Sequence, residues 1–145
     1  MLYAEDLSEG QTFQLGSYTI TEEEILEFAG KYDPVFIHVD PEAAAAGPFG
    51  GLIASGFNTM AIYQRLAVGG IWSKIAGIVG RSFEIRLPNP VRPGATITGS
   101  SEVQKVTLRP ERRDAVMILR TVLVDGEGRT VLIMVIDALI QARPG

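Results

Sequence analysis

The second half of the chain is a succession of four strand-like segments joined only by short turns. These segments are rich in Val, Ile, Leu and Thr and span residues 75–87, 95–106, 114–124 and 130–142. Such residues favour a pleated, half-buried surface. Neither Asp125–Gly128 nor the polar stretch 108–113 leaves room for a crossover helix, so consecutive strands are expected to pair antiparallel. The first of the four segments is predicted to be a broken strand.

The first half of the chain supplies one strand and two helices. A strand is predicted over residues 12–20, and a helix follows the capping-box pattern formed by Thr21 and Glu24. Residues 33–51 are expected to be loop-like, with one helical turn at the alanine run 43–46. A second, largely buried helix is predicted from Ser55 or Gly56 to residue 66, ended by the glycines at 69 and 70. The sequence therefore predicts an α+β fold, an antiparallel sheet wrapped around one apolar helix.

Composition narrows the possible chemistry. A length of 145 residues fits a single domain, 1–145. With no cysteine and one histidine, the chain has no disulfide, no zinc finger and no cysteine nucleophile, and we expect neither a metal nor a cofactor. The net charge of −4 and the lack of a basic cluster argue against a nucleic-acid partner. No signal-like start and no apolar run of spanning length is visible, so we expect a cytoplasmic protein without a membrane partner.

The only histidine stands close to an acid on a proline-bent segment. Asp33 and His38 lie five residues apart, with Pro34 between them and the end of the first predicted helix just before. A bend of this kind can bring both side chains to one small site, where a carboxylate and an imidazole would form a general acid–base pair. The alternative is that His38, which follows an apolar pair, is a structural hydrogen-bonding residue.

A second candidate element is the start of the buried helix. Ser55 and Gly56 stand where free backbone N–H groups can stabilise developing negative charge, so Gly56 N–H and Ser55 are candidates for binding an oxyanion. The alternative is that Ser55 caps the helix and Gly56 allows close packing. Asp40 is expected to cap the next turn. Further residues are candidates for lining the pocket: Tyr32, Val35, Phe36, Asn58 and Thr59.

Three motifs in this order resemble the MaoC-like domain family, which has the hot-dog fold and includes the R-specific enoyl-CoA hydratases. The first is Asp33 with His38 after four residues, followed by an acidic, alanine-rich segment at 39–44. The second is Gly-Gly-Leu-Ile-Ala-Ser-Gly at 50–56. The third is the Pro-Val-Arg-Pro-Gly turn at 90–94. The resemblance covers nearly the whole chain.

The resemblance implies a hot-dog fold, a long central helix wrapped by a strongly bent antiparallel sheet, in a homodimer or higher homo-oligomer. It implies a hydro-lyase that hydrates a trans-2-enoyl-CoA, or a related acyl thioester, to a 3-hydroxyacyl-CoA. By similarity, Asp33 and His38 would activate the water and the N–H of Gly56 would bind the thioester oxygen. This sequence departs from the usual motif, because Val35 and Phe36 replace Asn and Pro, and Ala95 replaces an Asp.

Two other functions remain open at this point. A hot-dog acyl-CoA thioesterase would use a carboxylate such as Asp33 to direct water at the carbonyl carbon. A non-catalytic acyl-CoA-binding homodimer is the other alternative, and the departures at Val35, Phe36 and Ala95 keep it open. The sequence predicts neither the chain length of the acyl group nor which residues meet the CoA phosphates.

Overall fold

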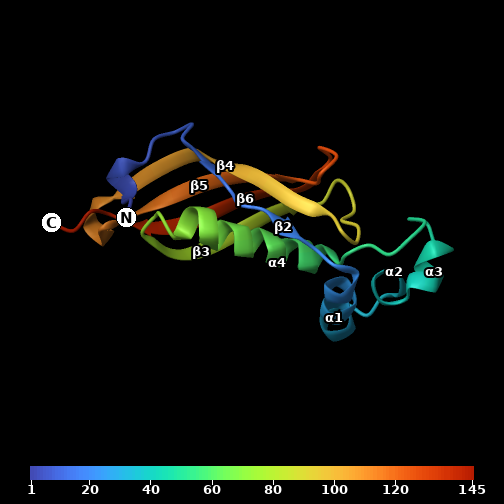
Figure 1. Ribbon diagram of the computed structural model, residues 1–145. Helices are drawn as coiled ribbons and strands as arrows, with labels where there is room; N and C mark the ends of the chain where they lie inside the picture. Colours follow the sequence, from blue (N-terminus) through green and yellow to red (C-terminus); the bar gives the residue numbers. More distant parts are fainter.

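The computed structural model describes all residues, 1–145, as an α+β fold with an open antiparallel sheet that curves around one helix (Figure 1). The strand order is β1-β4-β5-β6-β3, and β2 pairs with β4 beyond the end of β1. Every strand pair is antiparallel, as the short turns predict. The strands are β1 (Thr12–Gln14), β2 (Tyr18–Thr19), β3 (Gly77–Arg86), β4 (Thr96–Arg109), β5 (Asp114–Val124) and β6 (Thr130–Gln141).

The predicted strands of the second half are confirmed with small shifts at their ends. β3 is broken as expected, with register shifts against β6 at 77–79 and 80–82. β4 runs on to Arg109, so only Pro110–Arg112 forms the turn before β5. The prediction of one strand over 12–20 is wrong. That segment forms two short strands, and Gly16, which has low strand propensity, lies in the break between them.

The central helix is α4 (Gly56–Ala67), which lies along the concave side of the sheet (Figure 1). Ile62, Tyr63 and Leu66 are buried in the core that α4 shares with the sheet. The predicted end of this helix at residue 66 is confirmed within one residue. The two glycines do not stop the helical winding, however, since the chain continues through one π-helical turn, Val68–Trp72. Gly70 serves close packing there, because a Cβ atom on it would lie 2.8 Å from a methyl carbon of Leu15.

Three short helices gather at the end of the molecule where α4 begins, away from both chain termini (Figure 1). They are α1 (Glu22–Tyr32), α2 (Phe36–Val39) and α3 (Pro41–Ala45). A separate 3₁₀ turn, Ala4–Asp6, lies near the N-terminus. The expected loop over 33–51 is thus more ordered than predicted. Asp40 caps α3 as expected, since its Oδ1 accepts from the Ala43 N–H at 3.0 Å. This end of the fold carries the candidate site.

The hairpin between β5 and β6 is closed by one carboxylate. Asp125 Oδ1 accepts from the N–H groups of Glu127 and Arg129 at 2.9 and 3.0 Å, and Oδ2 accepts from Arg129 Nε at 3.0 Å. Burial opposes ionisation of Asp125, but these donors outweigh it, so the pKa of Asp125 is lower than usual. The ionised carboxylate is therefore favoured by folding.

Replacing the Asp125 carboxylate should make the free energy of unfolding less dependent on pH. Asp125→Ala is expected to lower the free energy of unfolding at pH 7 by about 1–3 kcal/mol, because it leaves hairpin N–H groups without their acceptor. A lowered folded-state pKa stabilises the fold above the ordinary aspartate pKa, and this contribution is lost as the pH falls through the folded value. Urea denaturation from pH 7 down to pH 3 should show the wild type and the variant converging. A constant difference would contradict the assignment.

None of the helices combines the length and the apolar composition that crossing a bilayer requires.

Candidate active site

The two predicted acid–base residues are brought together by a tight turn at Pro34. Asp33 ends α1, and its carbonyl accepts from the Val35 N–H at 2.8 Å, an i→i+2 turn centred on the proline. α2 then starts at once and carries His38 in its only turn. The chain thus folds back on itself, so that His38 Nε2 lies 3.5 Å from Asp33 Oδ2. The predicted convergence of these two side chains is present in the structure.

The protonation pattern of His38 follows from its second ring nitrogen. Nδ1 lies 2.7 Å from the carbonyl oxygen of Ile53, which can only accept a hydrogen bond. Nδ1 therefore carries the proton, and in the neutral imidazole Nε2 has the free lone pair. That lone pair is turned toward the carboxylate of Asp33. The His38 side chain is only 10% exposed, against 25% for that of Asp33, so the imidazole is the more enclosed partner.

Asp33 is held by a hydroxyl from the start of α4. Ser55 Oγ donates to Asp33 Oδ2 at 2.7 Å and accepts from the Phe57 N–H at 3.2 Å. The expected capping role of Ser55 is therefore present. Ser55 is completely buried, and its single proton is committed to the carboxylate. Its hydroxyl proton is thus not free for a bound ligand, whereas a side chain that binds an oxyanion needs a free donor.

The first turn of α4 leaves one backbone donor unused. Phe57 N–H donates to Ser55 Oγ, and the next two amides donate to the Ser55 carbonyl at 2.9 and 3.1 Å. Gly56 N–H has no acceptor within the chain. A Cβ atom on Gly56 would lie 2.6 Å from Leu87 Cδ1, so the end of β3 covers this glycine closely. The free amide is suited to stabilising negative charge at the positive end of the helix dipole.

The other predicted pocket residues lie in three different settings. Tyr32 is 63% exposed and packs on the ring of Phe28, with centroids 5.1 Å apart, so a packing role fits it better than lining an enclosed pocket. Val35 and Phe36 flank the turn and are each 46% exposed. Thr59 is buried and turns back toward the Ser55 carbonyl at 3.5 Å. None of these side chains forms a hydrogen bond to the Asp33–His38 pair.

Asn58 belongs to a neighbouring cluster that sequence reasoning did not anticipate. Its amide donates to Glu24 Oε2 at 3.3 Å, and the Tyr18 hydroxyl donates to the same carboxylate. Because of this hydrogen bond the pKa of Tyr18 is raised. Thr21 does cap α1 by accepting from the Glu24 N–H, but the Glu24 side chain does not close the capping box that the sequence predicts. It links α1 to α4 and β2, and only the tertiary fold reveals this.

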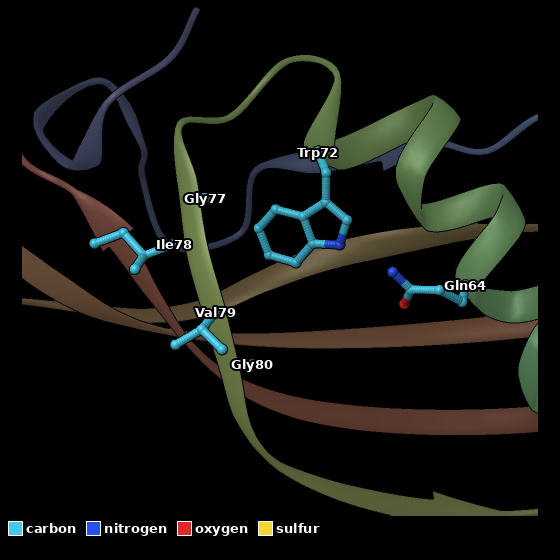
Figure 2. A pocket seen from close by; sticks show the side chains of 6 residues that line it. All are labelled: Gln64, Trp72, Gly77, Ile78, Val79 and Gly80. Carbon is cyan, nitrogen blue, oxygen red and sulfur yellow. The ribbon is translucent and has the colours of Figure 1, made fainter.

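A separate cleft lies at the far end of α4 (Figure 2). It has a volume of about 260 Å³ and is formed between Gln64 on α4, Trp72 on the π-helical turn and the start of β3 at 77–80. Two of its residues are glycines, and Trp72 packs directly over Gly77, where a Cβ atom would lie 2.8 Å from the indole ring. Neither Asp33 nor His38 lines this cleft, so it is distinct from the candidate site.

Comparison with known families gives one match that covers most of the chain. Residues 6–124 match the MaoC-like domain family. This range contains Asp33, His38, Ser55 and Gly56, so the candidate site lies inside the matched region.

Individual relatives and solved structures are consistent with this family assignment. The crystal structure of the MaoC-like dehydratase from Rhodospirillum rubrum superposes with a TM-score of 0.93 at 34% identity and covers 100% of both chains. The 3-hydroxyacyl-thioester dehydratase Z of Mycobacterium tuberculosis is 44% identical over 91 residues, 59% of this chain and 58% of that protein. The R-hydratase PhaJ1 from Pseudomonas aeruginosa has a TM-score of 0.75 at 20% identity over 98% of this chain and 86% of its own, a likeness of fold. The protein YdeM of Bacillus subtilis is 46% identical over 57 residues, 39% of this chain and 40% of that protein. The alignments with these two curated relatives thus span 40% and 58% of the relatives' lengths.

Proposed function

Because the chain belongs to the MaoC-like domain family, we propose that it is a hydro-lyase that reversibly hydrates a trans-2-enoyl thioester to a 3-hydroxyacyl thioester. The reacting acyl group would be carried as a CoA ester. Asp33 and His38 would activate the water, and Gly56 N–H would bind the thioester oxygen. The mycobacterial relative, whose name includes 3-hydroxyacyl-thioester dehydratase, supports this reaction class.

One observation carries the proposal, namely that His38 Nε2 and Asp33 Oδ2 lie 3.5 Å apart, and both atoms are acceptors when His38 is neutral and Asp33 is ionised. Nε2 of neutral His38 has a lone pair, and the ionised carboxylate of Asp33 can only accept hydrogen bonds. Two acceptors cannot bond to each other, but one water molecule can donate a hydrogen to each. Such a water keeps its oxygen lone pairs free to attack, and both of its protons have a base within reach.

The reaction can be written with these groups alone. The water oxygen bonds to C3 of the enoyl group while one water proton passes to the Asp33–His38 pair. The electrons of the C2–C3 double bond move onto the thioester, whose oxygen becomes an enolate oxyanion. Gly56 N–H stabilises this charge at the start of α4. Return of a proton to C2 completes the addition of one water molecule, and the reverse sequence is the dehydration.

An enoyl-CoA panel tests the proposal directly. Purified protein is mixed with trans-2-enoyl-CoA esters of increasing chain length, beginning with crotonyl-CoA, and loss of the conjugated thioester absorbance is followed. A free-thiol assay runs in parallel, because thioester hydrolysis releases CoA and hydration does not. Hydration without thiol release supports the proposal. Thiol release identifies a thioesterase instead, and thermal stabilisation by the esters without turnover identifies a binding protein.

We also propose that two copies of the chain associate through β3. This strand is the edge of the sheet, and only β6 pairs with it. Three of its apolar side chains are more than half exposed: Ile78 at 51%, Val79 at 54% and Phe83 at 54%. An edge that is long, apolar and unpaired is rarely left in water. A second β3, paired antiparallel across a twofold axis, would form hydrogen bonds with the unpaired backbone groups of this edge and cover these side chains.

A charge on β3 should separate the two copies. Val79→Lys is expected to shift the protein from dimer to monomer, measured by sedimentation velocity, because a buried unpaired ammonium is costly. Leu108→Lys is the matched control, since Leu108 is 49% exposed at the end of β4 and lies away from β3. A wild type that sediments as a monomer would refute the β3 dimer, and so would a Val79→Lys variant that remains a dimer.

A further inference from the structure

The segment just before α4 contacts both members of the acid–base pair. The Ile53 carbonyl accepts from His38 Nδ1, and two residues later the Ser55 hydroxyl donates to Asp33. The segment is itself fixed on both sides, because the Ile53 N–H donates to the Ile37 carbonyl at 3.1 Å and the Ala54 N–H donates to the Val91 carbonyl at 2.8 Å. Residues 53–55 therefore form a rigid support against which both side chains are aligned.

On the Asp33 side, that alignment depends on a single hydrogen bond. The 3.5 Å separation between Asp33 Oδ2 and His38 Nε2 exceeds the usual hydrogen-bond length. Ser55 is the only residue that donates a hydrogen bond to this carboxylate, and it does so at 2.7 Å. Without that donor, a side chain with one quarter of its surface exposed could rotate toward solvent.

The Ser55 hydroxyl cannot easily turn elsewhere. Its oxygen accepts from the Phe57 N–H, which fixes the position of Oγ over the first turn of α4. Burial excludes bulk water as a competing acceptor for its proton. The same hydrogen bond that caps the helix thus directs the hydroxyl proton at Asp33 Oδ2. A donor directed in this way favours one orientation of the carboxylate.

We propose that Ser55 is a positioning residue, which holds the Asp33 carboxylate in the orientation that lets it share a water with His38. The proposal rests on the hydration reaction proposed above. Ser55 acts through Asp33 and does not touch the substrate. Its role therefore differs from the oxyanion-binding role that the sequence predicts for it, which in the structure only the Gly56 N–H remains free to perform.

Two substitutions separate positioning from helix capping. Ser55→Gly removes the hydroxyl but keeps a residue that is tolerated at an N-cap. Its kcat is expected to fall about tenfold or more, with KM within about twofold, since the loss is a hydrogen bond to a charged group. Ser55→Thr keeps a hydroxyl on the same Cβ atom and should recover most of kcat. Thr21→Gly, which removes the equivalent cap of α1, is the matched control and should leave kcat unchanged.

A double-mutant cycle and a crystal structure complete the test. In an Asp33→Asn background, Ser55→Gly should cause little further loss of kcat, because the carboxylate that Ser55 orients is already absent. Full additivity would overturn the positioning role, and so would wild-type kcat in Ser55→Gly. The crystal structure of Ser55→Gly should show Asp33 turned away from His38, and an unmoved Asp33 would overturn the proposal even if the wild type hydrates nothing. A wild type inactive on every enoyl-CoA refutes the hydratase function separately.

Discussion

Asp33→Asn is expected to lower kcat/KM for an enoyl-CoA by about 10³-fold, and His38→Ala by a similar factor. An amide cannot take a proton from the shared water, and it presents one acceptor in place of a carboxylate. Alanine removes the Nε2 lone pair that faces Asp33. Initial rates of enoyl absorbance loss, measured with saturating and limiting substrate, give the change in kcat and in KM.

The same loop offers a matched control for this prediction. Asp40→Asn makes the identical chemical change seven residues later, at a carboxylate that caps α3 and forms no hydrogen bond or ion pair with His38. It should retain activity within about twofold. Circular dichroism and the unfolding midpoint should show that all three variants keep the fold. An Asp33→Asn or His38→Ala variant with wild-type turnover would refute the acid–base pair.

Gly56→Pro is expected to reduce kcat by about 10²–10³-fold, the loss that follows removal of one oxyanion donor. Proline has no N–H, so this change deletes the only unused amide in the first turn of α4. It is also compatible with the backbone, because proline is favoured at the first helical position. The preceding residue, Ser55, already has φ −55° and ψ 142°, the extended conformation that a following proline requires.

Gly56→Ala controls for the added bulk. Both variants introduce a Cβ atom next to Leu87, whose methyl group must move to make room. Only the proline variant also loses the amide proton. A much smaller loss in Gly56→Ala than in Gly56→Pro would assign the effect to the donor, whereas equal losses would assign it to crowding at Leu87. The ratio of the two kcat values, measured on one substrate, decides between them.

Much of the fold could be predicted because it depends on local patterns. The strands β5 and β6 follow directly from their apolar residues and the intervening Asp125–Gly128 turn, and α4 starts where its Ser55 cap predicts. The proximity of Asp33 and His38 could be predicted for the same reason, since one proline turn brings together residues five positions apart.

What failed depends on contacts between distant segments. The glycines at 69 and 70 look like a helix stop, but Gly70 is needed where Leu15 crosses the helix, and no local pattern encodes that crossing. The position of Ser55 at the helix N-terminus predicts an oxyanion-binding residue but does not predict that its hydroxyl donates a hydrogen bond to Asp33, 22 residues earlier in the chain. Glu24 likewise has a capping-box position, and its carboxylate is bound by Asn58 instead.

The open edge at β3 has a consequence for handling the protein. If two copies cover this edge, dilution exposes it, and an exposed apolar strand can add further strands without limit. Folding and association then form one equilibrium, so the melting temperature rises with protein concentration. Melting curves recorded at two protein concentrations should therefore show the lower melting temperature in the more dilute solution.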